Sequence, residues 1–72
     1  MYNQWIEVNS SNLKSVFYST YDSKLSVKFH SGSEYKYDRV PIQLYENLLN
    51  ASSKGSYFHS IIKDKFDCQR MI

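Results

Sequence analysis

Apolar and polar residues alternate without interruption between Lys24 and His30. The apolar residues are Leu25, Val27 and Phe29, and these alternate with Lys24, Ser26, Lys28 and His30. A period of two is that of a β-strand with one buried face. After a turn that contains Gly32, Tyr35 and Tyr37 alternate with polar residues in the same way. The two segments therefore predict an antiparallel hairpin.

The apolar pattern also predicts how the two strands of this hairpin pair. We expect Phe29 opposite Tyr35 and Val27 opposite Tyr37, with a three-residue turn centred on Gly32. A shift of one residue would set Phe29 opposite Glu34 and so place an apolar and a charged side chain on the same face, which disfavours that register in a sheet with one buried face. The expected register also places Lys28 opposite Lys36 on the outer face, and like charges at such positions destabilise a sheet.

The rest of the chain predicts two further strands before the hairpin and two helices after it. Short strands are expected over residues 4–8 and 13–21, where β-branched and aromatic residues gather. Helices are expected near residues 41–50, beginning at Pro41, and near residues 54–66. Strands grouped before helices favour an α+β class. The predicted architecture is a small antiparallel meander of three to four strands with a two-helix hairpin packed on one face.

The length and composition favour one globular domain over residues 1–72, with residues 67–72 as a loosely ordered tail. No apolar run reaches the ~20 residues of a membrane helix, so we expect no membrane partner. Cys68 is the single cysteine, which is typical of a reducing compartment and predicts a cytoplasmic protein. The net charge of +2 permits a polyanionic partner but does not require one.

Two places in the sequence are candidates for binding an anion. The first is the outer face of the hairpin, where a phosphate would relieve the opposed lysines; its residues are Lys24, Lys28, His30 and Lys36. The alternative is a solvated face that Glu34 and Asp38 neutralise. The second is the start of the later helix at Ser53, Lys54 and Gly55, because helix N-termini offer free N–H groups to anions. There the alternative is an ordinary cap and turn.

Other conspicuous residues favour structural roles. Tyr35 and Tyr37 would suit base stacking, but they share a face with Val27, which favours the core. His30, His59 and Cys68 lack the short spacing of zinc ligands, and no serine stands in a nucleophile motif. We therefore expect no metal, no cofactor and no catalytic residue.

These residues also occur in a recognisable order. Leu25-x-Val27-x-Phe29, Gly32, Tyr35-x-Tyr37 and Val40-Pro41, followed by Ala51-x-Ser53-x-Gly55, resemble a KTSC domain over about residues 7–66. This family is named after the C-terminal extension of some lysyl-tRNA synthetases and also occurs as stand-alone proteins in bacteria and phages. RNA binding has been suggested for it, so the resemblance implies an RNA ligand and supplies no catalytic residues.

Taken together, the residues and the resemblance predict a small non-catalytic module that binds RNA or another phosphate-bearing ligand. Two alternatives stay open. One is a protein–protein interaction module, such as a phage-encoded inhibitor of a host factor, and the other is a protein that sequesters a small nucleotide. The sequence leaves the oligomeric state open.

Overall fold

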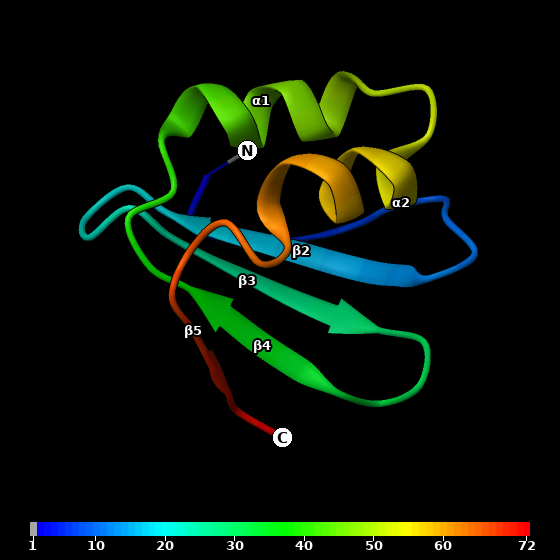
Figure 1. Cartoon of the computed structure of the whole chain (residues 1–72), viewed down its shortest axis with the longest axis horizontal. Coiled ribbons are helices and arrows are strands. Elements are labelled where there is room, and N and C mark those ends of the chain that lie inside the picture. The colour runs from blue at the N-terminus through cyan, green and yellow to red at the C-terminus, as the bar shows by residue number, and fades with distance from the viewer. Residues whose placement is uncertain (1) are drawn as a thin grey trace.

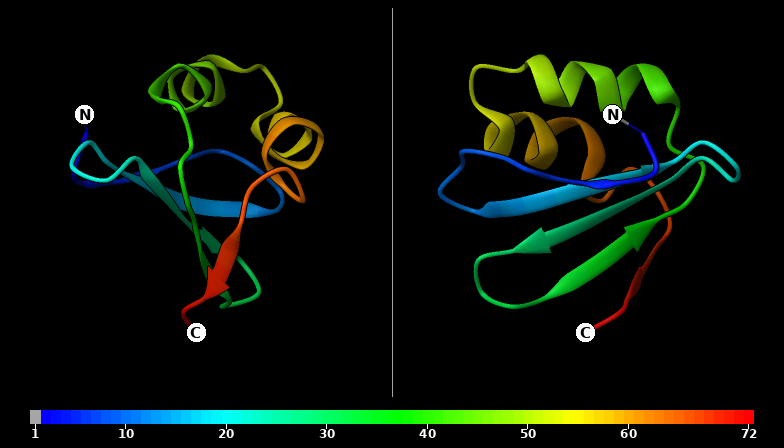
Figure 2. Two further views of the ribbon diagram at one scale, coloured as in Figure 1. Left: turned by 60° about the vertical axis from the view of Figure 1, so that its left-hand side comes forward. Right: turned by 180° about the vertical axis from the view of Figure 1, so that it is seen from behind.

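The computed structural model describes residues 2–72 and shows a five-stranded antiparallel sheet with helices on one face (Figure 1). The strands lie in sequence order: β1 (Trp5–Glu7), β2 (Leu13–Ser19), β3 (Lys24–Phe29), β4 (Glu34–Tyr37) and β5 (Cys68–Arg70). The helical layer holds α1 (Ile42–Asn50), α2 (Lys54–Tyr57) and the π-helix η1 (Phe58–Ile62). Figure 2 shows this layer and the opposite, uncovered face of the sheet from two further sides. The predicted α+β class is confirmed.

The core lies between the inner face of the sheet and the helices. Phe58 is at its centre, with its ring centroid 5.4 Å from that of Tyr37 and 5.6 Å from that of Phe29. Leu48 of α1 and Ile62 of η1 belong to the same cluster and are fully buried. Tyr37 is buried with them, so the interpretation of Tyr35 and Tyr37 as residues of the inner face holds.

The last residues form a strand and not the expected loose tail. β5 pairs with β4, with Cys68 opposite Tyr37 and Arg70 opposite Tyr35. The amide of Met71 extends the ladder by donating to the Glu34 carbonyl at 2.7 Å. This strand has only three residues, all of them exposed, so its sequence carries no alternation that could have predicted it.

The second helix is shorter than predicted, because it ends at Ile62 and not near residue 66. Its last turn is a π-helix, in which the Lys63 amide donates to the Phe58 carbonyl at 2.8 Å. Asp64 then adopts a positive φ of 66°, which is incompatible with a continuing helix. Phe66 still packs against the core from the following turn.

The hairpin register differs from the prediction by two residues. Val27 lies opposite Tyr35, and Leu25 lies opposite Tyr37. The turn has three residues, as expected, but Gly32 is its last residue and not its centre. The Gly32 amide donates to the Phe29 carbonyl, and the Phe29 amide donates to the Ser33 carbonyl, both at 2.9 Å. Gly32 has a φ of 101°, the conformation that such a turn requires at its final position.

The shift preserves the faces but changes the partners. Because the shift is an even number of residues, every side chain stays on its predicted face. Lys28, however, lies opposite Glu34, and Lys36 lies opposite Ser26. The expected Lys28–Lys36 pair is therefore wrong, and the cross-strand charges at Lys28 are opposite in sign.

A bulge in β2 settles which of its residues face the core. Leu13 pairs with Phe29 while Ser15 pairs with Lys28, so Lys14 is an extra residue in the ladder. The bulge lets Leu13 share the inner face with Val16 although the two are an odd number of positions, three, apart. Phe17 consequently lies on the outer face.

Tyr18 and Tyr45 form the stacked pair that joins the sheet to α1. Their ring centroids are 5.0 Å apart at an interplanar angle of 18°. The Tyr18 hydroxyl donates to the Val40 carbonyl at 2.6 Å. The Tyr45 hydroxyl is buried and has no hydrogen-bond partner among residues 2–72. The Tyr18 hydroxyl therefore stabilises the fold, whereas the buried, unpaired Tyr45 hydroxyl destabilises it.

This contrast predicts opposite effects of two matched substitutions. Tyr18→Phe should lower the free energy of unfolding by roughly 1–3 kcal/mol, because it leaves the buried Val40 carbonyl without a donor. Tyr45→Phe should leave stability unchanged or raise it, because it removes an unpaired buried hydroxyl. Urea unfolding of both variants tests this. Equal losses in the two variants would contradict the assignment.

The raised pKa of the buried Tyr37 phenol predicts that the protein loses stability at alkaline pH. Burial raises the pKa of Tyr37 to about 12, with a smaller electrostatic contribution from its cross-strand partner Cys68. The ordinary pKa of a tyrosine, taken here for the unfolded chain, is 10.0. The stability that depends on the neutral phenol is thus fully present below pH 10 and is lost between pH 10 and about pH 12. Over this pH range the urea concentration at the midpoint of unfolding should fall less steeply for Tyr37→Phe than for the parent. If the midpoints of the two proteins fall in parallel, Tyr37 does not contribute to the loss of stability.

Candidate outer-face site

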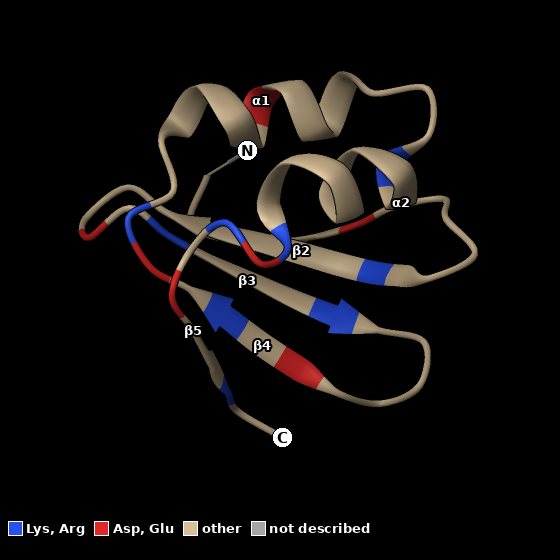
Figure 3. Cartoon of the chain, in the orientation of Figure 1, with Lys and Arg blue, Asp and Glu red and all other residues tan. Residues whose placement is uncertain are grey.

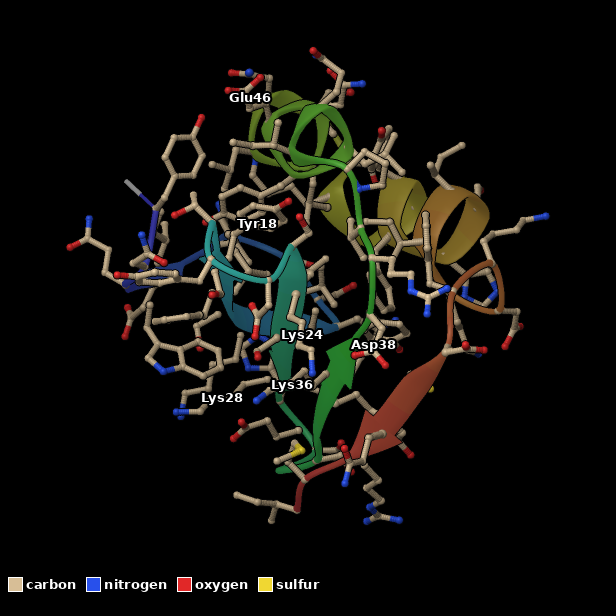
Figure 4. The ribbon with its side chains drawn as sticks, turned by 90° about the vertical axis from the view of Figure 1, so that its left-hand side faces the viewer. Tyr18, Lys24, Lys28, Lys36, Asp38 and Glu46 are labelled. Carbon is tan, nitrogen blue, oxygen red and sulfur yellow. The ribbon has the colours of Figure 1, made fainter. Side chains whose placement is uncertain are left out.

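The outer face of the sheet is the face turned away from the helices, and it holds three of the predicted lysines. Figure 4 shows Lys24, Lys28 and Lys36 together on this side. The pairing places one row of residues straight across all five strands: Trp5, Phe17, Ser26, Lys36 and Gln69. We call these five residues the central row. It has aromatic side chains at one end and a lysine toward the other, and none of its members is acidic.

The aromatic end of the central row is a contacting pair of rings. The centroids of Trp5 and Phe17 are 5.5 Å apart at an angle of 52°. Trp5 is 40% exposed, unusually high for so large an apolar side chain. The ammonium of Lys28 lies over the indole, 4.2 Å from its centroid. Trp5 is thus both accessible and already in contact with a cation.

Acidic residues flank the central row on both sides. Lys24 forms an ion pair with Asp38, with 3.7 Å between Nζ and Oδ1. Lys28 has Glu34 as its cross-strand partner, while Ser15 separates it from Glu7. Figure 3 shows both signs of charge along β3 and β4. Lys36, by contrast, has only Ser26 and Gln69 as cross-strand neighbours.

His30 lies at the end of the sheet and does not join the lysines. Its Nε2 is 2.9 Å from the Ser10 carbonyl, and a carbonyl can only accept, so this nitrogen donates. The His30 amide donates to the Asn12 carbonyl at 3.0 Å. His30 therefore ties the β3–β4 turn to the β1–β2 loop.

The second predicted site lines a polar groove of about 460 Å³ between the β1–β2 loop and the start of α2. Ser53, Lys54 and Gly55 all line it, but each already has a structural role. Ser53 Oγ caps α2 by accepting from the Ser56 amide at 3.4 Å. Lys54 Nζ donates to the Ala51 carbonyl at 3.0 Å. A Cβ on Gly55 would lie 3.2 Å from Ser10 Oγ, so a larger residue here would require Ser10 to shift by a few tenths of an ångström.

Sequence reasoning missed the aromatic residues of the outer face. Base stacking was considered only at Tyr35 and Tyr37, for which the sequence correctly favoured the core. The signal for Phe17 was present, since it alternates with the buried Val16 and Tyr18. Trp5 alternates in the same way with Ile6. What the sequence lacked was the register that brings Trp5 and Phe17 side by side.

Residues 2–72 contain no group of three His, Cys, Asp or Glu side chains placed to hold a metal ion. None of the helices in this range has the length and apolar character needed to cross a membrane.

Comparison with known proteins identifies relatives over nearly the whole chain. A lysine–tRNA ligase of Trichormus variabilis is 39% identical over 66 residues, which are 92% of this chain but only 12% of the ligase. An uncharacterized protein of Stutzerimonas stutzeri is 36% identical over 81% of this chain and 82% of its own length. The chain thus spans about an eighth of the ligase and most of the smaller protein.

The fold and the family model agree with these relatives. The crystal structure of a KTSC domain protein from Yersinia pestis superposes with a TM-score of 0.90, at 34% identity, over 96% of this chain and 97% of that one. The model of the KTSC domain matches residues 9–66. The chain therefore belongs to the KTSC domain family, as its sequence motifs suggested.

Proposed function

We propose that this domain is a non-catalytic module that binds single-stranded RNA on its outer face. The observation that carries the proposal is the central row, which places the exposed Trp5, its half-buried neighbour Phe17 and the lysine Lys36 on one acid-free line across the sheet. An unpaired base would stack on Trp5, and the adjoining phosphates would meet Lys28 and Lys36. The lone Cys68 fits the reducing cytoplasm in which such a module would work.

The spacing within the central row suits a short stretch of RNA. Neighbouring strands lie ~4.8 Å apart, so Trp5 and Lys36, three strands apart, are separated by roughly 14 Å at the backbone. The small Ser26 in the middle of the row is only 5% exposed. A base at the aromatic end and a phosphate at Lys36 can therefore lie on the row with no protruding side chain at its middle.

The charges of the outer face predict that stacking supplies most of the affinity. Three carboxylates, those of Glu7, Glu34 and Asp38, share the face with the predicted lysines Lys24, Lys28 and Lys36. Such a face attracts a polyanion only weakly at long range. Base–aromatic stacking, by contrast, is worth about 1–3 kcal/mol per base and needs no net charge.

The relatives support an RNA ligand in particular. In the lysine–tRNA ligases the matched segment is 12% of proteins whose named substrate is a tRNA. An accessory segment with affinity for unpaired RNA would be useful there and would need no catalytic residues of its own. The two alternative functions are protein binding and the sequestration of a small nucleotide. A binding experiment with RNA distinguishes both of them from RNA binding.

Trp5→Ala should weaken binding of a labelled 12-nucleotide RNA of random sequence by about 5-fold to 150-fold, the equivalent of ~1–3 kcal/mol. Lys36→Gln should weaken it less and should reduce the log–log salt slope by about 0.7, the share of one phosphate contact on a single strand. Fluorescence anisotropy at several salt concentrations measures both effects.

Two variants serve as matched controls. Tyr21→Ala removes an aromatic side chain that is 99% exposed but lies in the β2–β3 turn. Lys63→Gln removes an exposed lysine beyond η1, on the helical side. Neither should change the affinity. If the Trp5 and Lys36 variants bind as the parent does, or if only the controls lose affinity, the outer face is not the RNA site.

A further inference from the structure

Lys28 is placed where a stacked base would lie. Its ammonium is 4.2 Å from the indole centroid of Trp5. The rings of Trp5 and Phe17 are in direct contact, so a base cannot enter between them. A base that stacks on the remaining surface of the indole would have its own centroid at a similar distance. The ammonium and the base therefore compete for one position.

The ammonium takes this position although a carboxylate is near. Glu34 is the cross-strand partner of Lys28, yet the one ion pair found among residues 2–72 joins Lys24 to Asp38. The side chain of Lys28 thus lies over the ring instead of forming a salt bridge with Glu34. A cation–π contact at an exposed site is weak enough for a ligand to replace it.

We propose that Lys28 covers Trp5 in the free domain and that an incoming base displaces it, after which the released ammonium pairs with the phosphate of the same RNA. This inference rests on the proposed function and adds a basis for ligand choice. A free nucleoside must also displace the ammonium, but it has no phosphate with which the ammonium could pair. A phosphate-bearing strand displaces the ammonium and then binds it. Lys28 accordingly selects nucleotides within a strand against free nucleosides.

The single tryptophan allows a direct test, because fluorescence excited at wavelengths that the seven tyrosines do not absorb reports on Trp5 alone. The probes are adenosine and a 12-nucleotide oligoadenylate, titrated against the parent and Lys28→Gln. Removing the competing ammonium should raise the affinity for adenosine about twofold to fivefold, which corresponds to the roughly 0.5–1 kcal/mol of an exposed cation–π contact. The same substitution should lower the affinity for oligoadenylate and reduce its salt slope by about 0.7.

Two further variants control for charge and for folding. Lys24→Gln removes a lysine that lies on the same face but forms an ion pair with Asp38. The affinity of this variant for adenosine should therefore match that of the parent. Lys28→Arg keeps a cation that can cover the indole, so it should bind adenosine as the parent does. Thermal melting of each variant verifies that the fold is retained.

The outcomes separate this inference from the proposed function. Suppose that oligoadenylate binds the parent and quenches Trp5, but that adenosine binds Lys28→Gln and the parent with equal affinity. The outer face is then still the RNA site, but the displacement of Lys28 is refuted. Displacement is also refuted if Lys28→Gln binds oligoadenylate as tightly as the parent. If oligoadenylate neither binds the parent nor changes its fluorescence, the proposed function fails and the displacement fails with it.

Discussion

The backbone conformation of Gly32 determines how the two central lysine-bearing strands face each other. Its φ of 101° closes a three-residue turn in which Gly32 occupies the final position. That turn fixes the pairing of β3 with β4, and the pairing decides which outer-face residues are neighbours. With Gly32 at the centre of the turn, Lys28 would lie beside Lys36. With Gly32 at the end, Lys36 joins Trp5, Phe17 and Ser26 in one row.

The inner face holds this arrangement in place. Helix α1 is joined to the sheet by the Tyr18–Tyr45 stack, and η1 inserts Phe58 between Phe29 and Tyr37. Because the helices bury only one face, the other face remains free for a ligand. A small domain buries little of its surface and has a thin margin of stability, so these aromatic contacts matter more than they would in a larger protein.

Much of the fold could be predicted from alternation, while the hairpin register and the last strand could not. Alternation of Leu25 with Ser26 and of Tyr35 with Lys36 assigns each residue to a face, and an even shift in register leaves those assignments intact. The choice between two even registers depends on where glycine is needed in the turn, which hydrophobicity does not reveal. β5 has three exposed residues and no alternation, so only its pairing with β4 makes it a strand.

The candidate site was predictable in part for the same reasons. Lys24, Lys28 and Lys36 follow from alternation alone, and the structure places them on one face. His30 stands at the end of its strand, where the turn redirects it to the Ser10 carbonyl. Trp5 belongs to a three-residue edge strand, and its contact with Phe17 exists only once β1 pairs with β2. The residue most central to the proposed site is therefore one whose position depends on tertiary structure.

Chemical-shift mapping by ¹⁵N NMR tests the central claim most directly, because it reports every amide and the one indole N–H at the same time. On addition of a single-stranded 12-nucleotide RNA, the indole N–H of Trp5 and the amides of Phe17, Ser26 and Lys36 should shift together and saturate. Shifts confined to the polar groove, at residues 9–12 and 52–60, would contradict the account, as would a spectrum that RNA leaves unchanged.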